Sequence, residues 1–267
     1  MFTFSQVILL KVAVAGKGGV GKTLVAGALA YFLTEKGFKV LAIDADSSPN
    51  LALTLGISPA HAMKIVPISE NQELIRTKTS TPYPGVYRLS FTVDDVVRDF
   101  AVKSPLNVNL LVMGTIRAAG EGCTCTANAL VRSLLRHLIV ERDEAVVMDM
   151  EAGVEHMGRG TAKHVDTMLI ITDSNLKSME IAKKIHTLAT EAGIRRIFLV
   201  GNKISEKEEE NAIKEFASSN NLVLLDFIPY DKQISKADRK GETPLNIAKN
   251  SAGLSVVKRI CERLLQQ

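Results

Sequence analysis

Tryptophan is absent from this sequence, and aromatic residues make up only 5% of it. Cysteine is scarce as well: the chain has three, and two of them are separated by a single residue. So few cysteines make a poor disulfide framework, so the thiols are expected to be reduced and the protein to be cytoplasmic. The low aromatic content gives little support to a surface that stacks nucleic-acid bases.

An excess of one charge sign and a long apolar run are also missing. The 33 Lys and Arg residues are interleaved with 29 Asp and Glu residues, which leaves a net charge of +4 and predicts no nucleic-acid partner. Lys11, Lys17 and Lys22 interrupt the apolar N-terminal third before the roughly 18 residues of a membrane span, so no stable membrane association is expected. The segment Met1–Ala15 lacks a basic start and is predicted to be a strand, not a signal peptide.

The chain does contain a regular alternation of short apolar runs and longer helical patterns. The short runs are rich in β-branched residues and apolar throughout, which is typical of strands buried on both faces of a parallel sheet. The predicted strands are Val7–Ala15, Val40–Ile43, Asn109–Met113, Ala145–Met148, Thr167–Ile171, Ile197–Val200 and Leu222–Ile228. The predicted helices are Lys22–Lys36, Ala127–Glu141, Leu176–Ala192, Glu206–Ser219 and Leu254–Gln266.

This order of elements predicts an α/β fold, with a largely parallel twisted sheet of about seven or eight strands and helices on both faces. No linker rich in Gly, Ser and Pro divides the chain, so residues 1–267 are expected to form a single domain. The stretch of about 56–106 has weak periodicity and a turn signal at Thr81–Gly85, with a possible helix near Asp94–Ala101. We interpret it as an irregular insertion within the domain.

A glycine-rich loop joins the first predicted strand to the first predicted helix. Its sequence from Gly16 to Thr23 is GKGGVGKT, and the strand–loop–helix context is the one that a phosphate-binding loop requires. Backbone N–H groups converge on phosphate oxygens, Lys22 reaches the β- and γ-phosphates, and the Thr23 hydroxyl holds Mg²⁺. The residues expected to bind the nucleotide here are Gly18, Gly19, Val20, Gly21, Lys22 and Thr23.

A second lysine, Lys17, stands in this loop, and with it the loop resembles that of the deviant P-loop ATPases. That family includes septum-site and chromosome-partitioning ATPases, the nitrogenase iron protein and metal-centre maturation factors. The resemblance implies a nucleotide-dependent homodimer in which Lys17 reaches the partner's phosphates and acts catalytically beside Lys22. The alternative for Lys17 is an ordinary solvated loop lysine.

Two aspartates, Asp44 and Asp46, follow the second predicted strand, at the edge where ligands bind in open α/β sheets. By the resemblance they belong to switch I, with Asp46 as the catalytic residue that orients or deprotonates the attacking water and Asp44 near Mg²⁺. The two roles could be exchanged. A pair of turn-forming residues is the alternative.

A third aspartate, Asp149, ends the predicted strand Ala145–Met148 and matches a Walker B carboxylate. It is the natural Mg²⁺ partner of Thr23. The following Gly153 matches a switch II glycine that can give its N–H to the γ-phosphate. A lone aspartate at a strand end would be an ordinary cap or turn residue, and the other phosphate-site elements favour the metal role.

The base is predicted to be adenine. Residues Gly201–Ser205 follow a predicted strand where GTPases have Asn-Lys-x-Asp, and Ser205 stands in place of that aspartate. A neutral hydroxyl cannot replace the charge-assisted pair that the carboxylate makes with guanine. We therefore expect ATP as the nucleotide, with Asn202 bonding the adenine edge and the loop at Pro229 and Tyr230 covering the ring, as in the family.

Cys123 and Cys125 lie in a glycine-rich loop just before a predicted helix. The positive end of that helix favours the thiolate form that binds soft metals. One intervening residue lets both sulfurs chelate one ion, but two ligands are only half of a four-coordinate site. On this pattern alone, the two cysteines are more commonly small buried residues with a structural role than metal ligands. A two-fold dimer would bring two such pairs together and complete the site.

The segments around the cysteines extend the resemblance. Glu121–Cys125 together with Asp149–His156 and Gly158–Thr161 looks like the CooC-type nickel-insertion ATPases of carbon monoxide dehydrogenase maturation, and the similarity runs over most of the chain. The resemblance implies a Mg-dependent ATPase whose homodimer depends on nucleotide and metal. It also implies that Cys123 and Cys125 bind Ni²⁺, with Zn²⁺ as an alternative, and that carbon monoxide dehydrogenase receives the nickel.

Two other functions stay open at this point. A spatial-organisation ATPase of the septum-site or partitioning type would act on DNA or a membrane, with the basic residues of the final helix, Lys258, Arg259 and Arg263, beside an apolar stripe. We predict instead that this stripe, which includes Cys261, packs on the sheet. An iron–sulfur carrier or reductase of the nitrogenase iron protein type would use four cysteines from two subunits for one cluster.

Overall fold

The computed structural model describes residues 10–46, 48–79, 93–114, 133–139, 144–151, 162, 164–247 and 250–266. The strands are β1 (Lys11–Gly16), β2 (Val40–Ala45), β3 (Val102–Lys103), β4 (Asn109–Val112), β5 (Ala145–Met150), β6 (Thr167–Thr172), β7 (Arg196–Ile204) and β8 (Leu224–Pro229). The helices are α1 (Lys22–Glu35), α2 (Leu51–Thr54), α3 (Pro59–Ala62), α4 (Gln72–Thr79), α5 (Val93–Phe100), α8 (Leu176–Glu191), α9 (Lys207–Ser219), α10 (Lys232–Arg239) and α11 (Ala252–Leu265), with the 3-10 turns η1 (Ile68–Glu70) and η2 (Pro244–Ile247). Residues 133–139 are also helical.

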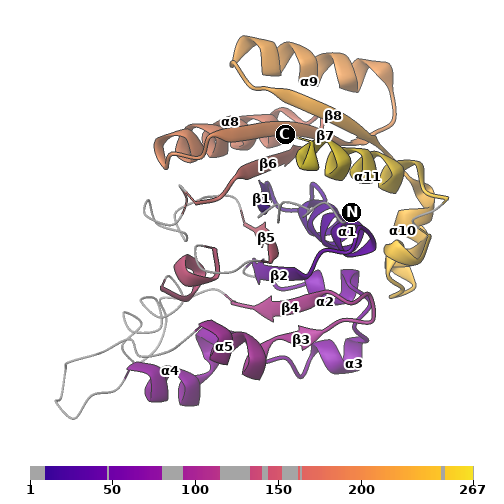
Figure 1. Cartoon of the computed structure of the whole chain (residues 1–267). Coiled ribbons are helices and arrows are strands. Elements are labelled where there is room, and N and C mark those ends of the chain that lie inside the picture. Colours follow the sequence, from indigo (N-terminus) through magenta and orange to yellow (C-terminus); the bar gives the residue numbers. More distant parts are fainter. Residues whose placement is uncertain are drawn as a thin grey trace, which may run out of the picture.

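The strands form one eight-stranded sheet in the order β3-β4-β2-β5-β1-β6-β7-β8 (Figure 1). Neighbouring strands are parallel, except for the antiparallel pair of β3 and β4. The predicted α/β fold, with a largely parallel sheet of about seven or eight strands, is confirmed. The chain moves from β1 outward to β2 and β4, returns to β5, and then builds β6, β7 and β8 on the other side. The strand order therefore reverses around β1, and ligands bind outside the carboxyl ends of the strands at such a point.

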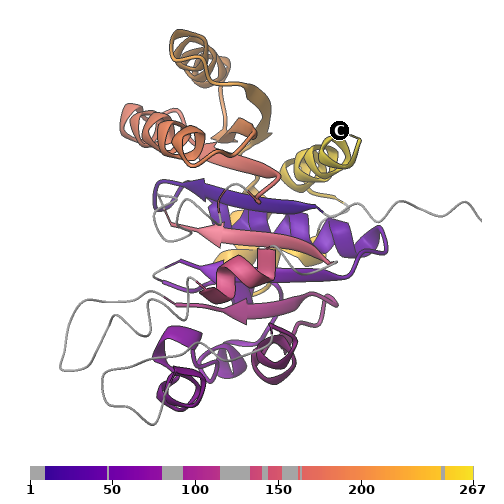
Figure 2. The ribbon, with the colours of Figure 1, turned by 60° about the vertical axis from the view of Figure 1, so that its left-hand side comes forward.

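Helices cover both faces of the sheet because its strands are apolar on both sides. Along β1, Val12 and Val14 belong to the core that contains residues of α1 and α11, whereas Ala13 and Ala15 belong to the core that contains residues of α8, α9 and 133–139. Every residue of β1, β5 and β6 is buried. Figures 1 and 2 show α1 and α11 on one side of the sheet and α8 on the other. Alternation by two residues along each strand thus builds a three-layer domain.

Several predicted strands were too short at their carboxyl ends, and two of these differences concern site residues. The strand predicted to end at Met148 continues to Met150, so Asp149 lies inside β5. The strand predicted to end at Val200 continues to Ile204, so Asn202 lies inside β7. Polar residues occupy these last strand positions because their side chains lie at the ligand-binding edge and not in the core, and an apolar pattern therefore stops before the strand does.

The predicted insertion at about 56–106 is more regular than its sequence suggests. Its described residues form α3, η1, α4, α5 and β3, and the helix predicted near Asp94–Ala101 is α5. Leu74 of α4 and Val96 of α5 are buried in the core beside the sheet. The two-residue strand β3 pairs with β4 at the sheet edge, a contact too short for hydrophobic periodicity to reveal.

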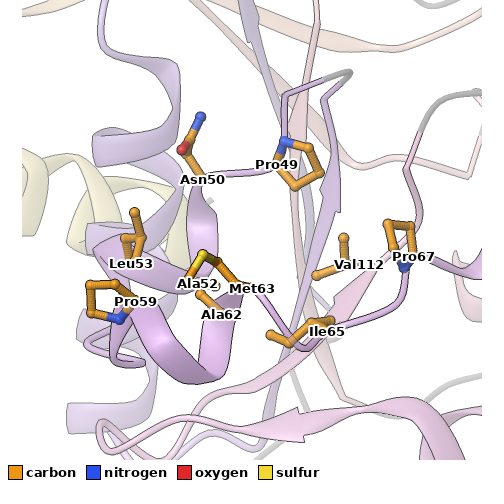
Figure 3. A pocket seen from close by; sticks show the side chains of 10 residues that line it. All are labelled: Pro49, Asn50, Ala52, Leu53, Pro59, Ala62, Met63, Ile65, Pro67 and Val112. Atoms are coloured by element: carbon orange, nitrogen blue, oxygen red, sulfur yellow. The ribbon is translucent and has the colours of Figure 1, made fainter.

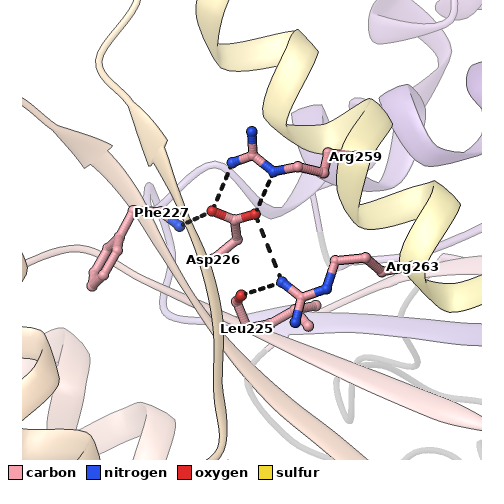
Figure 4. A network of polar contacts seen from close by, with 5 residues as sticks. All are labelled: Leu225, Asp226, Phe227, Arg259 and Arg263. Atoms are coloured by element: carbon pink, nitrogen blue, oxygen red, sulfur yellow. Dashed lines mark hydrogen bonds and ion pairs between the residues drawn. The ribbon is translucent and has the colours of Figure 1, made fainter.

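The last helix, α11, packs on the sheet through apolar and polar contacts. Its buried residues include Leu254, Val257, Ile260, Cys261 and Leu264, so the stripe packs as predicted. On its outer side, Arg259 donates two hydrogen bonds of 2.9 Å to Asp226 of β8, and Arg263 donates to the carbonyl oxygen of Leu225 at 2.7 Å (Figure 4). Within the described residues, no helix combines the length and the apolar character needed to cross a membrane.

Candidate nucleotide and metal site

The glycine-rich loop leaves β1 at Gly16 and enters α1 at Lys22. Gly19 and Gly21 have φ angles of +84° and +98°, in the left-handed region that favours glycine. A Cβ at Gly16 would lie 2.3 Å from the carbonyl oxygen of Ile171 in β6, so a side chain cannot fit there. These glycines allow the tight loop that places the first N–H groups of α1 at the sheet edge, where they can bind an anion.

Two residues near the end of β7 support this loop. Asn202 is buried and donates from Nδ2 to the carbonyl oxygen of Val20 at 2.7 Å, and Lys203 donates from Nζ to the carbonyl oxygen of Gly19 at 2.8 Å. A Cβ at Gly21 would lie 2.3 Å from Asn202 Nδ2, so glycine is required at that position. The residue predicted to bond the adenine edge thus holds the phosphate loop in place, and its contact with the base stays a prediction.

Asp44 and Asp149 face each other as register partners on β2 and β5, and both are fully buried. Asp44 accepts hydrogen bonds from the backbone N–H groups of Asp46 at 3.2 Å and Leu51 at 2.9 Å. It therefore connects the switch I loop to the start of α2. Neither carboxylate oxygen of Asp149 has a hydrogen-bond partner of normal geometry among the described residues.

Burial raises the pKa of Asp149 to about 7 and the pKa of Asp44 to about 6. The Thr23 hydroxyl and the Lys22 charge partly oppose the shift in the pKa of Asp149, and the backbone N–H of Leu51 partly opposes it for Asp44. A divalent cation would stabilise the charged form of such a buried carboxylate. Asp149 and Thr23 therefore fit a Mg²⁺ site, while both oxygens of Asp44 already accept backbone N–H groups.

The described residues do not bring three His, Cys, Asp or Glu side chains together as a metal-binding group.

Lys22 and Asp46 are brought together as well. Lys22 Nζ lies 3.5 Å from Asp46 Oδ2, and the two side chains are 6% and 16% exposed. The other oxygen of Asp46 accepts from the backbone N–H of Ser48 at 3.0 Å. The predicted phosphate-binding lysine is therefore paired with the predicted water-positioning carboxylate, and nucleotide phosphates would compete with Asp46 for it.

A cavity of about 510 Å³ opens beside the phosphate loop. The loop and α1 form one wall, and α10 and η2 form another. The lining residues are Gly19, Gly21, Lys22, Thr23, Leu24, Asn50, Leu53, Thr54, Lys203, Ile234, Ser235, Asp238, Gly241, Glu242 and Pro244. Pro229 and Tyr230 do not line it. Tyr230 is exposed, and its hydroxyl accepts a hydrogen bond of 3.2 Å from Ser235.

Sequence reasoning missed α10, which supplies Ile234, Ser235 and Asp238 to this cavity. The helix is short and buries only Ala237, so its apolar pattern is weak. A capping signal was present: Asp231 accepts from the backbone N–H of Gln233, as an N-cap residue does.

A second cavity, of about 330 Å³, lies on the other side of α2 and is mostly apolar (Figure 3). Asn50 and Leu53 line both cavities. The start of α2 therefore separates the nucleotide cavity from an apolar groove at the carboxyl end of β4.

Several predicted residues lie outside the described part of the chain. They include the cysteine pair, Cys123 and Cys125, and the switch II glycine, Gly153. The third cysteine, Cys261, is described: it is buried in α11, and burial raises the pKa of its thiol to about 11. Cys261 is therefore a packing residue and not a thiolate ligand.

Comparison with known proteins agrees with this geometry. Residues 11–245 match the CobQ/CobB/MinD/ParA nucleotide binding domain. The carbon monoxide dehydrogenase accessory protein CooC of Rhodospirillum rubrum is 40% identical over 234 residues, which cover 87% of this chain and 88% of that protein.

Two solved structures share the fold. A ParA family ATPase from Chlorobium tepidum has a TM-score of 0.69 and 17% identity, over 94% of this chain and 97% of that one. The septum site-determining protein MinD of Pyrococcus horikoshii, complexed with Mg-ADP, has a TM-score of 0.65 and 20% identity, over 96% of both chains.

Proposed function

This chain belongs to the CobQ/CobB/MinD/ParA family of nucleotide-binding domains, and on that premise we propose that it is a metallochaperone that binds Ni²⁺ and assists its insertion into carbon monoxide dehydrogenase. Membership makes the chain a P-loop ATPase that uses ATP and Mg²⁺. The observation that carries the finer proposal is the 40% identity to CooC over 87% of the chain.

Each of the described site residues has its own role in ATP hydrolysis. Lys22 and the N–H groups of the loop bind the β- and γ-phosphates, and Thr23 and Asp149 hold Mg²⁺, which neutralises phosphate charge when bound. Asp46 leaves Lys22 as the phosphates arrive and then positions the attacking water. Asn202 keeps the loop in its phosphate-binding conformation through Val20.

The proposal includes a homodimer that forms when both protomers hold ATP. Lys17 is a half-buried residue of the phosphate loop and acts on the partner's phosphates, where its charge stabilises the transition state. Hydrolysis removes the negative charge of the γ-phosphate, which attracts Lys17, and the dimer reopens. ATP is therefore the timer of the cycle.

Nickel is the cargo of this cycle. Cys123 and Cys125 supply two thiolates per chain, and a two-fold axis brings four together. Because the metal then bridges the protomers, it stabilises the dimer, and the dimer raises metal affinity by the same factor. Zn²⁺ would compete for such a thiolate site. A cytoplasmic location, where thiols stay reduced, suits this chemistry.

The metal site is tested by titrating Ni²⁺ into anaerobically purified apo-protein while light scattering follows its mass. We expect one ion per two chains and a dimer. Cys123→Ser and Cys125→Ser should lose tight binding, while Cys261→Ala, the matched control, retains it because that buried thiol is not a ligand. One ion per chain without a change in mass would contradict the shared site. Stoichiometric iron with broad iron–sulfide absorbance would support the iron–sulfur carrier instead.

A spatial-organisation ATPase is the second candidate, since the solved structures that share the fold include a ParA family ATPase and MinD. The apolar face of α11 is buried against the sheet and is not available to a membrane. ATP-dependent sedimentation with anionic vesicles or with DNA, together with no nickel binding, would favour this candidate.

A further inference from the structure

Lys203 adopts a backbone conformation that lysine rarely takes. Its φ angle is +62°, in the left-handed region that favours glycine. Within the described ranges, the other non-glycine residues with a positive φ are Asn107 and Asn221, and asparagine is one of the residue types that tolerate this region best. Glycine or asparagine would suit position 203 better than lysine if only the backbone mattered. The lysine therefore points to a use of its side chain.

An irregularity in β7 turns this residue toward the phosphate loop. Between Gly201 and Ile204, the pairing of β7 with β8 shifts by one residue, and Lys203 lies within this bulge. Its backbone N–H donates to Asn202 Oδ1 at 2.9 Å. Bulges beside binding sites commonly redirect a side chain. Here the side chain of Lys203 reaches the phosphate loop, where Nζ donates to the carbonyl oxygen of Gly19 at 2.8 Å.

The same lysine borders the space beside the loop. Lys203 lines the cavity of about 510 Å³, and its side chain is exposed. A hydrogen bond that water can reach contributes little, because water competes for both partners. A nucleoside in this cavity would cover Lys203 and exclude that water, which strengthens the bond from Nζ to Gly19. Gly19 has a φ of +84° and belongs to the phosphate loop, so the stronger bond would fix the loop.

We propose that Lys203 is a positioning residue that makes the order of the phosphate loop depend on the nucleoside part of ATP. The nucleoside covers Lys203, Lys203 holds Gly19, and the N–H groups of the loop are then in place for the triphosphate. Binding energy from the part of the substrate that does not react thus organises the site of the part that does. This role rests on ATP binding, which the family shares, and is independent of nickel.

The contribution of the amine is tested with Lys203→Gly and Lys203→Met in the full chain. Glycine accepts a φ of +62° and methionine does not, so Lys203→Gly should have the higher melting temperature of the two. Both variants lack the amine, and both should bind a non-hydrolysable ATP analogue about tenfold more weakly than the wild-type chain, the range for a hydrogen bond from a charged donor. A purely structural role would make affinity follow the melting temperature instead.

Two further variants complete this comparison. Lys203→Arg keeps a cationic donor and should restore affinity to within about threefold of wild type. Asn221→Gly, which relieves a φ of +55° beyond the end of α9, is the matched control and should leave affinity unchanged. Wild-type affinity in Lys203→Met, which keeps the apolar stem of the lysine, would overturn the proposal.

The dependence on the nucleoside is tested with inorganic tripolyphosphate, which carries the phosphates without base or ribose. Competition against a fluorescent ATP analogue in the presence of Mg²⁺ gives both affinities. Lys203→Met should lose about tenfold for the ATP analogue and less than about twofold for tripolyphosphate. An equal loss for both ligands would overturn the proposal, because Lys203 would then hold the loop whether or not a nucleoside covers it. Both experiments are done without nickel, so failure of the nickel proposal would leave their outcome unchanged.

Discussion

Lys22 Nζ lies 3.5 Å from Asp46 Oδ2, which connects the phosphate loop directly to switch I. Both groups are largely buried, so the attraction between them is stronger than between exposed charges. The phosphates of a nucleotide offer several charged oxygens to Lys22, and they compete there with the single carboxylate of Asp46. We therefore expect nucleotide binding to release Asp46, so that the same carboxylate holds the lysine at one stage and the attacking water at the next.

Asp46→Asn should block hydrolysis without loss of binding. Without the carboxylate that positions water, the hydrolysis rate should fall about 10²- to 10⁴-fold, while Lys22, freed from its partner, binds an ATP analogue at least as tightly as before. The ATP-bound dimer should accumulate. Single-turnover hydrolysis and equilibrium binding separate the two effects. Normal hydrolysis in Asp46→Asn, with loss of hydrolysis in Asp44→Asn, would show that the two aspartates have the exchanged roles.

Asp149→Asn should stabilise the protein that holds neither nucleotide nor Mg²⁺, and only at high pH. Burial raises the pKa of Asp149 from its ordinary 3.8 to about 7, so the folded state binds this proton more tightly than the unfolded state. The free energy of unfolding contributed by this carboxyl therefore falls as the pH rises from about 4 to about 7. We expect a higher melting temperature for Asp149→Asn at pH 8 and little difference at pH 4.5. Glu191→Gln, on an exposed residue, is the control.

The same substitution should have the opposite effect on magnesium. An amide is a weaker Mg²⁺ ligand than a carboxylate, so Mg²⁺-dependent tightening of ATP binding should drop at least tenfold in Asp149→Asn. Titrating Mg²⁺ at fixed nucleotide measures this. An unchanged Mg²⁺ dependence would remove Asp149 from the metal site.

The sequence predicted those parts of the fold and site whose pattern is carried by residues close together in the sequence. The buried strands and the glycine loop followed from local patterns, because parallel strands are apolar throughout and the loop needs glycine at fixed positions. The continuation of β7 through Asn202 was missed because Asn202 and Lys203 are polar residues that support the phosphate loop. The apolar pattern of the strand therefore stops before the strand does. The contribution of α10 was missed because Ile234 and Asp238 reach the nucleotide cavity only through the tertiary fold. The contact of Asp44 with Leu51 is equally invisible to a local pattern.

Lys17→Ala and Lys22→Ala should have different consequences. Lys22 serves its own phosphate loop, so Lys22→Ala should abolish nucleotide binding or hydrolysis. Lys17→Ala should change nucleotide binding by the isolated chain less than about threefold and yet abolish association with the ATP analogue and multiple turnover. Sedimentation velocity and nucleotide titration distinguish the two, with Lys184→Ala, an exposed lysine on α8, as the control. Unchanged association in Lys17→Ala would refute its action on the partner.

Gly21→Ala and Gly18→Ala compare two glycines of the same loop. Gly21 has a φ of +98°, and an added Cβ would lie 2.3 Å from Asn202 Nδ2, so Gly21→Ala strains the backbone and displaces the side chain that holds Val20. We expect a loss of about 1–3 kcal/mol in the free energy of unfolding and a more than tenfold loss of nucleotide affinity. A Cβ at Gly18 meets nothing within 4 Å, so Gly18→Ala should change the free energy of unfolding by less than about 0.5 kcal/mol. Urea denaturation measures both, and equal losses in the two variants would mean that the contact between Asn202 and the loop does not determine its conformation.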